Sequence, residues 1–127
     1  SSDHDFKIAT IVELYTEKSY FATPAIVTDY SEQHQYNLHN VFNDDHLSQI
    51  DAEYIHPYQP YQDGTRASCN ISKLRKQRMT PCVIDSHSTR EKSGVVMYEV
   101  SYLNSNGNDL VKEVLPFSRV RRRRTMN

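Results

Sequence analysis

The 127-residue sequence is poor in several residue types, and each shortage excludes a class of protein. It has no tryptophan, three glycines and two cysteines. Three scattered glycines provide neither a phosphate-cradling loop nor a Gly-x-Ser-x-Gly nucleophile elbow. Two cysteines are too few for a disulfide framework or a cysteine-rich zinc site. We therefore expect Cys69 and Cys82 to be reduced thiols of a cytosolic or nuclear protein.

Long apolar runs are also missing. The sequence has no stretch of about 18 apolar residues, and it does not open with a charged segment followed by an apolar one. We therefore expect neither a membrane span nor a secretory signal. Hydrophobic residues make up 37% of the chain and the mean hydropathy is −0.74, which predicts a modest core. Nine tyrosines and four phenylalanines nevertheless give an aromatic content that is typical of a folded chain.

The net charge of −1 conceals a strong asymmetry along the chain. Up to Asp63 the sequence has eleven acidic and two basic residues, which gives a net charge of −9. From Gly64 onward it has five acidic and thirteen basic residues, which gives +8. Ten of the thirteen aromatic residues lie in the acidic half. Such a chain can attract a cationic peptide through one half and a polyanion through the other.

A connector divides the sequence near its middle. Residues 56–64 contain two prolines and a glycine and have no apolar periodicity, so we expect one domain at residues 1–57 and another at residues 58–127. No sustained helical periodicity is present, and the expected fold class is all-β. Short β-branched and aromatic stretches between polar turns predict strands at residues 6–15, 20–27, 35–42, 46–50, 65–74, 80–84, 95–103 and 109–115.

The two halves resemble each other in sequence. Residues 23–27 (TPAIV) match residues 80–84 (TPCVI), and residues 36–38 match residues 98–100. Because proline lacks an N–H group, it is confined to strand starts, edges or bulges, so each half has a strand that opens or bends at the same place. These matches favour an internal duplication.

The first half carries a series of motifs that resembles a known family. An aromatic residue precedes a polar turn, an aromatic-rich strand follows, and a Phe-x-Asp motif leads to a closing hydrophobic residue. In chain order the motifs are Tyr15, Tyr20-Phe21-Ala22, Tyr36-Asn37-Leu38, Phe42-Asn43-Asp44 and Ile50. In this respect nearly the whole chain resembles the tandem Tudor domains of DNA-damage checkpoint mediator proteins. The resemblance implies two tandem SH3-like (Tudor) five-stranded barrels packed together, in a nuclear protein that binds chromatin.

The resemblance also implies recognition of methylated lysine on a histone tail. Aromatic ring faces hold a methylammonium group by cation–π attraction, and a carboxylate at the rim accepts the remaining N–H of a mono- or dimethyl group. The residues that would form this cage are Tyr15, Tyr20, Phe42, Asp44 and, as the alternative acid, Asp45.

One position departs from the family pattern. Ala22 stands where family members often carry a cage aromatic, and Tyr30, Tyr58 or Tyr61 could complete the cage instead. A simpler interpretation of the same residues stays open. Small barrels bury tyrosine and phenylalanine in their cores, and consecutive aspartates are common in turns.

The second half lacks these aromatics and is basic instead. Ser72 and Gln77 stand at the positions that match Tyr15 and Tyr20, so no cage is expected there. Clustered lysine and arginine bind phosphates, which predicts contact with the backbone of DNA or with a nucleosome. The alternative is a solvated, disordered tail. The candidate nucleic-acid-binding residues are Lys73, Arg75, Lys76, Arg78, Arg119, Arg121, Arg122, Arg123 and Arg124.

Metal and catalytic sites are not indicated. His34, His39 and His46 have no accompanying cysteine, and their spacing is not that of a zinc site, so we expect no metal site and no cofactor. Cys82 follows Pro81 inside a predicted strand with no base beside it in the sequence. We therefore expect a binding module and not an enzyme.

Two other classes of function stay open. One is a DNA- or RNA-binding pair of SH3-like barrels without methyl-lysine recognition, carried by the basic half. The other is a peptide-binding scaffold whose acidic, aromatic half binds an unmodified or arginine-methylated peptide. Selectivity for the methylation state and sensitivity to salt distinguish these classes.

Overall fold

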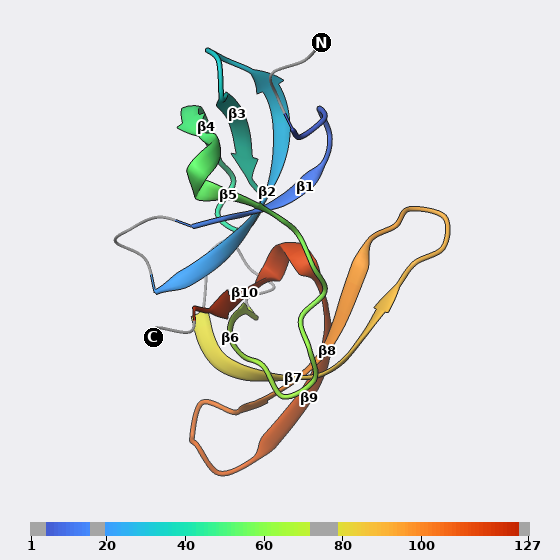
Figure 1. Cartoon of the computed structure of the whole chain (residues 1–127). Coiled ribbons are helices and arrows are strands. Elements are labelled where there is room, and N and C mark those ends of the chain that lie inside the picture. Colours follow the sequence, from blue (N-terminus) through green and yellow to red (C-terminus); the bar gives the residue numbers. More distant parts are fainter. Residues whose placement is uncertain (1–4, 16–19, 72–78, 125–127) are drawn as a thin grey trace. The chain divides into compact units, whose positions relative to one another are not determined.

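The computed structural model describes residues 5–15, 20–71 and 79–124, and these residues form an all-β structure (Figure 1). Within them the helical elements are two single turns of 3₁₀ helix, and the paired strands of each unit run antiparallel. The predicted all-β class is therefore confirmed. The chain divides into two compact units, residues 1–59 and 60–127.

The first unit is an antiparallel sheet with the strand order β4-β3-β2-β1-β5. Its core is formed by inward-facing residues that alternate with polar ones, among them Val12, Val27 and Leu38. The register between β2 and β3 shifts after Val27, and such a bulge bends a strand. The elements are β1 (Ile11–Leu14), β2 (Phe21–Tyr30), β3 (Gln35–Asn40), β4 (Asp45–Asp51), the 3₁₀ turn η1 (Ala52–Tyr54) and β5 (Ile55–Pro57).

The second unit repeats this plan, with the strand order β9-β8-β7-β6-β10. Its buried residues include Ile84, Val100 and Val120, and a register shift after Ile84 marks the equivalent bulge. A 3₁₀ turn again precedes the last strand. The elements are β6 (Arg66–Asn70), β7 (Met79–Thr89), β8 (Val96–Leu103), β9 (Leu110–Pro116), the 3₁₀ turn η2 (Phe117–Arg119) and β10 (Val120–Arg123).

One tyrosine in each unit anchors the segment that leads into the first strand. Tyr36 is 1% exposed and its hydroxyl accepts a hydrogen bond from the backbone N–H of Phe6 at 3.1 Å. Tyr98 is fully buried and accepts one from the N–H of Tyr61 at 3.0 Å. The same donor and acceptor therefore recur at equivalent places, which is the structural counterpart of the sequence repeat.

Two short strands were not predicted from the sequence. β5 and β10 have three and four residues, too few for an alternating pattern to stand out. β5 enters the region that the sequence assigns to the connector, and Pro57 at its end pairs with Val12. The C-terminal strand β10 lies in the arginine run and pairs with β6.

The prediction of two reduced thiols is wrong. Cys69 and Cys82 form a disulfide between β6 and β7, with their Cα atoms 6.1 Å apart. Antiparallel pairing explains this bond, because Cys69 lies opposite Thr80 while Cys82 lies opposite Ala67, so the two cysteines are diagonal neighbours on one face. Both side chains are buried. The separation of the two cysteines along the chain does not reveal this cross-strand proximity.

Candidate functional site

The first two predicted cage residues lie at the same end of the β1–β2 pair. Tyr15 follows β1 and Tyr20 precedes β2, whose register is fixed by the pairing of Leu14 with Thr23. Tyr20 is 63% exposed, a large value for an aromatic side chain. Residues 16–19 between them lie outside the described residues.

Tyr15 is half-buried and held from two sides. Its hydroxyl donates to Oε1 of Glu13 at 3.0 Å, and its ring lies 4.2 Å from the imidazole of His56 between ring centroids. Glu13 is only 4% exposed. The buried Glu13 side chain and the His56 ring therefore fix the orientation of the Tyr15 ring.

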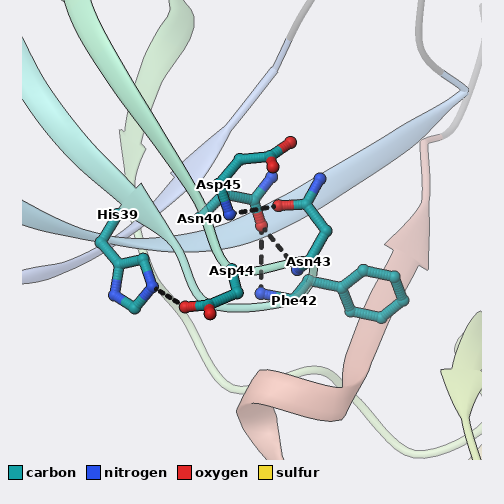
Figure 2. A network of polar contacts seen from close by, with 6 residues as sticks. All are labelled: His39, Asn40, Phe42, Asn43, Asp44 and Asp45. Atoms are coloured by element: carbon teal, nitrogen blue, oxygen red, sulfur yellow. Dashed lines mark hydrogen bonds and ion pairs between the residues drawn. The ribbon is translucent and has the colours of Figure 1, made fainter. Parts of the chain in front are cut away.

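The other three predicted cage residues lie in the turn between β3 and β4, which holds Phe42 and Asp44, and at the start of β4, which is Asp45 (Figure 2). Asn40 organises this turn, because its side-chain oxygen accepts hydrogen bonds from the backbone N–H groups of Phe42 and Asn43 at 3.0 and 3.3 Å. The carbonyl of Asn40 also accepts from the N–H of Asp44 at 2.7 Å. Asp44 adopts the left-handed backbone region with φ of 66°, which aspartate tolerates better than most residues.

Within this turn the predicted cage residues point to different sides. The Asp44 carboxylate is directed at His39, with Oδ1 2.5 Å from Nε2, while the Phe42 ring points the other way (Figure 2). Phe42 is 5% exposed, so its ring face is not open to a ligand in this conformation. Asp45 begins β4 and is exposed. Both carboxylates are therefore accessible to solvent, but that of Asp44 is paired with His39.

The β3–β4 turn and the Tyr15–Tyr20 end of β1 and β2 lie at the same end of the sheet. Successive antiparallel strands reverse direction, so the end of β1, the start of β2 and the end of β3 lie at the same end of the sheet. This end of the sheet contains the aromatic and acidic residues of the first unit that the resemblance singles out. Two of the three aromatics proposed as substitutes lie elsewhere: Tyr61 stacks on Tyr98 at 5.0 Å in the second unit, and Tyr30 packs edge-on against Tyr36 at 6.0 Å.

Histidines gather beside the same turn, which the sequence did not predict. His39 of β3 lies opposite His46 of β4, and their rings stack with centroids 4.6 Å apart and planes 10° from parallel. With Asp44 they form a cluster in which one donor atom from each residue lies within 4.8 Å of the others. A separation of seven residues matches no familiar ligand motif, and only the strand register reveals that these histidines are neighbours.

The candidate nucleic-acid-binding residues fall into a described and an undescribed group. Lys73, Arg75, Lys76 and Arg78 lie outside the described residues. Arg119 lies in η2, and the arginines at positions 121–123 lie in β10, so this basic run belongs to a sheet and not to a disordered tail. Because side chains alternate across a strand, Arg121 and Arg123 face one side and Arg122 the other. Burial lowers the pKa of the Arg121 guanidinium, because desolvation disfavours its charged form.

Comparisons with known proteins leave the chain without an assigned family. No protein-family model matches the sequence, and no curated protein matches it.

No helix in the described residues is long and apolar enough to cross a membrane. Both cysteines are joined in the disulfide, so neither offers a thiol nucleophile in this form.

Proposed function

We propose that the chain is a pair of tandem SH3-like barrels of the Tudor type, and that it is a nuclear chromatin reader without catalytic activity. Its first unit would bind a methylated lysine of a histone tail. The duplicated order of five strands, with a bulged second strand and a 3₁₀ turn before the last, supports the barrel assignment. The observation that carries the functional proposal is the exposed ring of Tyr20 at the end of the β1–β2 pair, in the unit whose sequence is acidic.

The side chains at this end of the first sheet suit a methylammonium ligand. Tyr20 offers an open ring face and Tyr15 a second ring, oriented by Glu13, while Asp45 offers a rim carboxylate. A methylated lysine keeps its charge but loses hydrogen-bond donors, so it gains more from ring faces than from a polar pocket. Phe42 and Asp44 would join this cage only after the β3–β4 turn rearranges, since they point apart in this structure.

Charge separation along the chain supports the choice of partner. A histone tail is cationic and suits the half with a net charge of −9, and nucleosomal DNA is anionic and suits the half with +8. The DNA contact would be made through phosphates by the basic residues of the second unit, among which Arg123 is exposed.

The test is a binding titration with histone peptides carrying un-, mono-, di- and trimethylated lysine. We expect methyl-dependent binding that falls about tenfold in Tyr20→Ala and is retained in Tyr20→Phe, because phenylalanine keeps the ring face. Leu110→Ala is a matched control, since Leu110 is 64% exposed and lies in the second unit. Equal affinity of Tyr20→Ala and the parent chain would overturn the proposal.

The same titration should be run with and without a reductant. The nucleus keeps most cysteines reduced, whereas Cys69 and Cys82 are joined in this structure. The proposed cage lies in the first unit, which contains no cysteine. We therefore expect peptide affinity to be the same in both conditions as long as the chain remains folded.

A second candidate function is DNA or RNA binding without methyl-lysine recognition. The observation that favours it is the set of arginines held in β10. Titration with a short DNA duplex at two salt concentrations tests it, because log affinity falls with log salt by roughly 0.9 for each phosphate contacted. Salt-sensitive DNA binding together with no peptide binding would favour this candidate. Peptide binding that ignores methylation would favour a general peptide-binding scaffold.

A further inference from the structure

We propose that His39, Asp44 and His46 form a binding site for a divalent transition-metal ion, with zinc as the ion that fits best. The site lies on the outer face of the β3–β4 hairpin. It uses only residues of the first unit. Asp44 is also a predicted cage residue, but the metal site does not depend on the proposed methyl-lysine function.

Strand register brings the two imidazoles together. His39 pairs with His46 directly across β3 and β4, and the stacked rings lie 4.6 Å apart. Asp44, in the turn that joins the two strands, already places Oδ1 2.5 Å from Nε2 of His39. All three donor atoms lie within 4.8 Å of one another.

A tetrahedral zinc ion needs only a small adjustment of this cluster. Bonds of about 2.0–2.1 Å to nitrogen and oxygen place neighbouring ligand atoms about 3.3 Å apart. The His39–Asp44 pair must therefore open slightly, and the His46 ring must tilt inward. Both changes are side-chain rotations at accessible positions, since His46 is exposed and the Asp44 side chain is 87% exposed.

The backbone of the turn is fixed before any ion binds. Asn40 is 7% exposed. Its side-chain oxygen accepts hydrogen bonds from the N–H groups of Phe42 and Asn43, and its backbone carbonyl accepts one from the N–H of Asp44. The side chain of Asn43 in turn accepts from the N–H of Asp45 at 3.0 Å. A turn held in this way keeps the Asp44 carboxylate beside the histidines, so less conformational entropy is lost when an ion binds.

The donor set selects the class of ion. Two imidazole nitrogens and one carboxylate suit zinc and its neighbours in the transition series, whereas magnesium and calcium prefer oxygen ligands throughout. Three protein ligands leave a fourth tetrahedral position for water. The second unit supplies an internal comparison: at the positions of His39 and His46 it has Ser101 and Lys112, which pair with each other in the same register. That unit has no equivalent of the site at these positions.

The test is calorimetric titration of the metal-free chain with zinc, in buffer without chelator and without peptide. We expect one saturable zinc equivalent whose affinity falls roughly tenfold or more in His46→Asn and in Asp44→Asn. Asparagine tolerates the left-handed backbone of Asp44, so the second variant should keep the turn. Cobalt provides a second readout, because a tetrahedral site gives intense visible absorption that the variants should lose.

Other histidines provide the matched controls. His34 and His87 are exposed and lie outside the cluster, so the double variant His34→Asn/His87→Asn removes as many imidazoles as His39→Asn/His46→Asn does. Zinc binding that is kept in the first double variant and lost in the second establishes the site. Equal loss in both, or the absence of saturable binding to the parent chain, would overturn the proposal. The absence of peptide from this titration keeps its outcome separate from that of the reader function.

Discussion

The two units share one plan and differ in what they add to it. Both have five strands paired in the same order, and in both a buried tyrosine hydroxyl accepts a backbone N–H. Their leading loops also match: Ala9 and Gly64 have positive φ and donate to the carbonyls of Val27 and Ile84. We therefore assign the features that recur in both units to the shared fold.

Positions that differ between the units are the better guide to function. The strand registers align Tyr15 with Asn70. The aromatic residue at the end of β1 therefore has no aromatic counterpart at the end of β6. The His39–His46 pair aligns with Ser101–Lys112. Both the aromatic at the end of β1 and the histidine cluster belong to the first unit alone at these aligned positions, which supports assigning ligand binding to that unit.

The cores differ as well. Leu14 and Ala25 are buried in the first unit, and the same registers align them with Cys69 and Cys82. A packed apolar pair in one unit thus corresponds to a covalent bond in the other. The comparison indicates that the second unit relies on its disulfide where the first relies on side-chain packing.

Reduction of the disulfide should give the largest effect and should separate the units. The bond spans 13 residues, and closing a loop of this size stabilises a fold by about 3 kcal/mol. In a domain this small, that loss lowers the melting temperature by roughly 10–20 °C. We expect a reductant to lower the melting temperature of the second unit alone. Calorimetry or residue-resolved amide hydrogen exchange would measure this change.

A pair of substitutions sharpens this prediction. Cys69→Leu/Cys82→Ala copies the apolar pair of the first unit, whereas Cys69→Ala/Cys82→Ala leaves a cavity at the larger position. We expect the first variant to be the more stable of the two under reducing conditions. If both variants melt together, the alignment of the two cores has no energetic meaning.

Removing the tyrosine hydroxyls should have a smaller effect of the same sign in both units. Tyr36→Phe and Tyr98→Phe each leave one backbone N–H without its acceptor, at a cost of about 1–3 kcal/mol when that group is buried. The N–H of Tyr61 is buried and that of Phe6 is partly buried. We therefore expect Tyr98→Phe to be the more damaging, as measured by urea unfolding. A larger loss in Tyr36→Phe would contradict the ranking of the two anchors by the burial of the N–H group that each one satisfies.

The sequence predicted the elements of the fold better than their pairing. The repeated Thr-Pro motif indicated two similar halves, and alternation located most strands. Counting back from Pro81 matches Ser72 to Tyr15, but the strand registers assign that place to Asn70, because the count ignores the different loop lengths before the two strands. The disulfide and the His39–His46 pair depend on which strands lie side by side, which no local pattern encodes.

The candidate site was predicted unevenly for the same reason. Tyr20 is exposed, as a ligand-binding aromatic should be, while Phe42 is buried. A Phe-x-Asp motif does not reveal that a turn directs its two side chains apart, because that direction is set by Asn40 and by the left-handed backbone of Asp44. Turn geometry of this kind depends on side-chain hydrogen bonds within a few residues.

The smallest expected effect is the stability change on removing an exposed side chain. This measurement separates effects on folding from effects on ligand binding when the two units are compared. Tyr20 and Leu110 are 63% and 64% exposed, one in each unit, so truncating either to alanine should alter the free energy of unfolding by less than about 0.5 kcal/mol. If the two alanine variants are equally stable, a difference between them in ligand binding reports on function and not on folding. A large loss of stability in Tyr20→Ala would instead show that its ring supports the fold, and loss of peptide binding in that variant would no longer identify a cage.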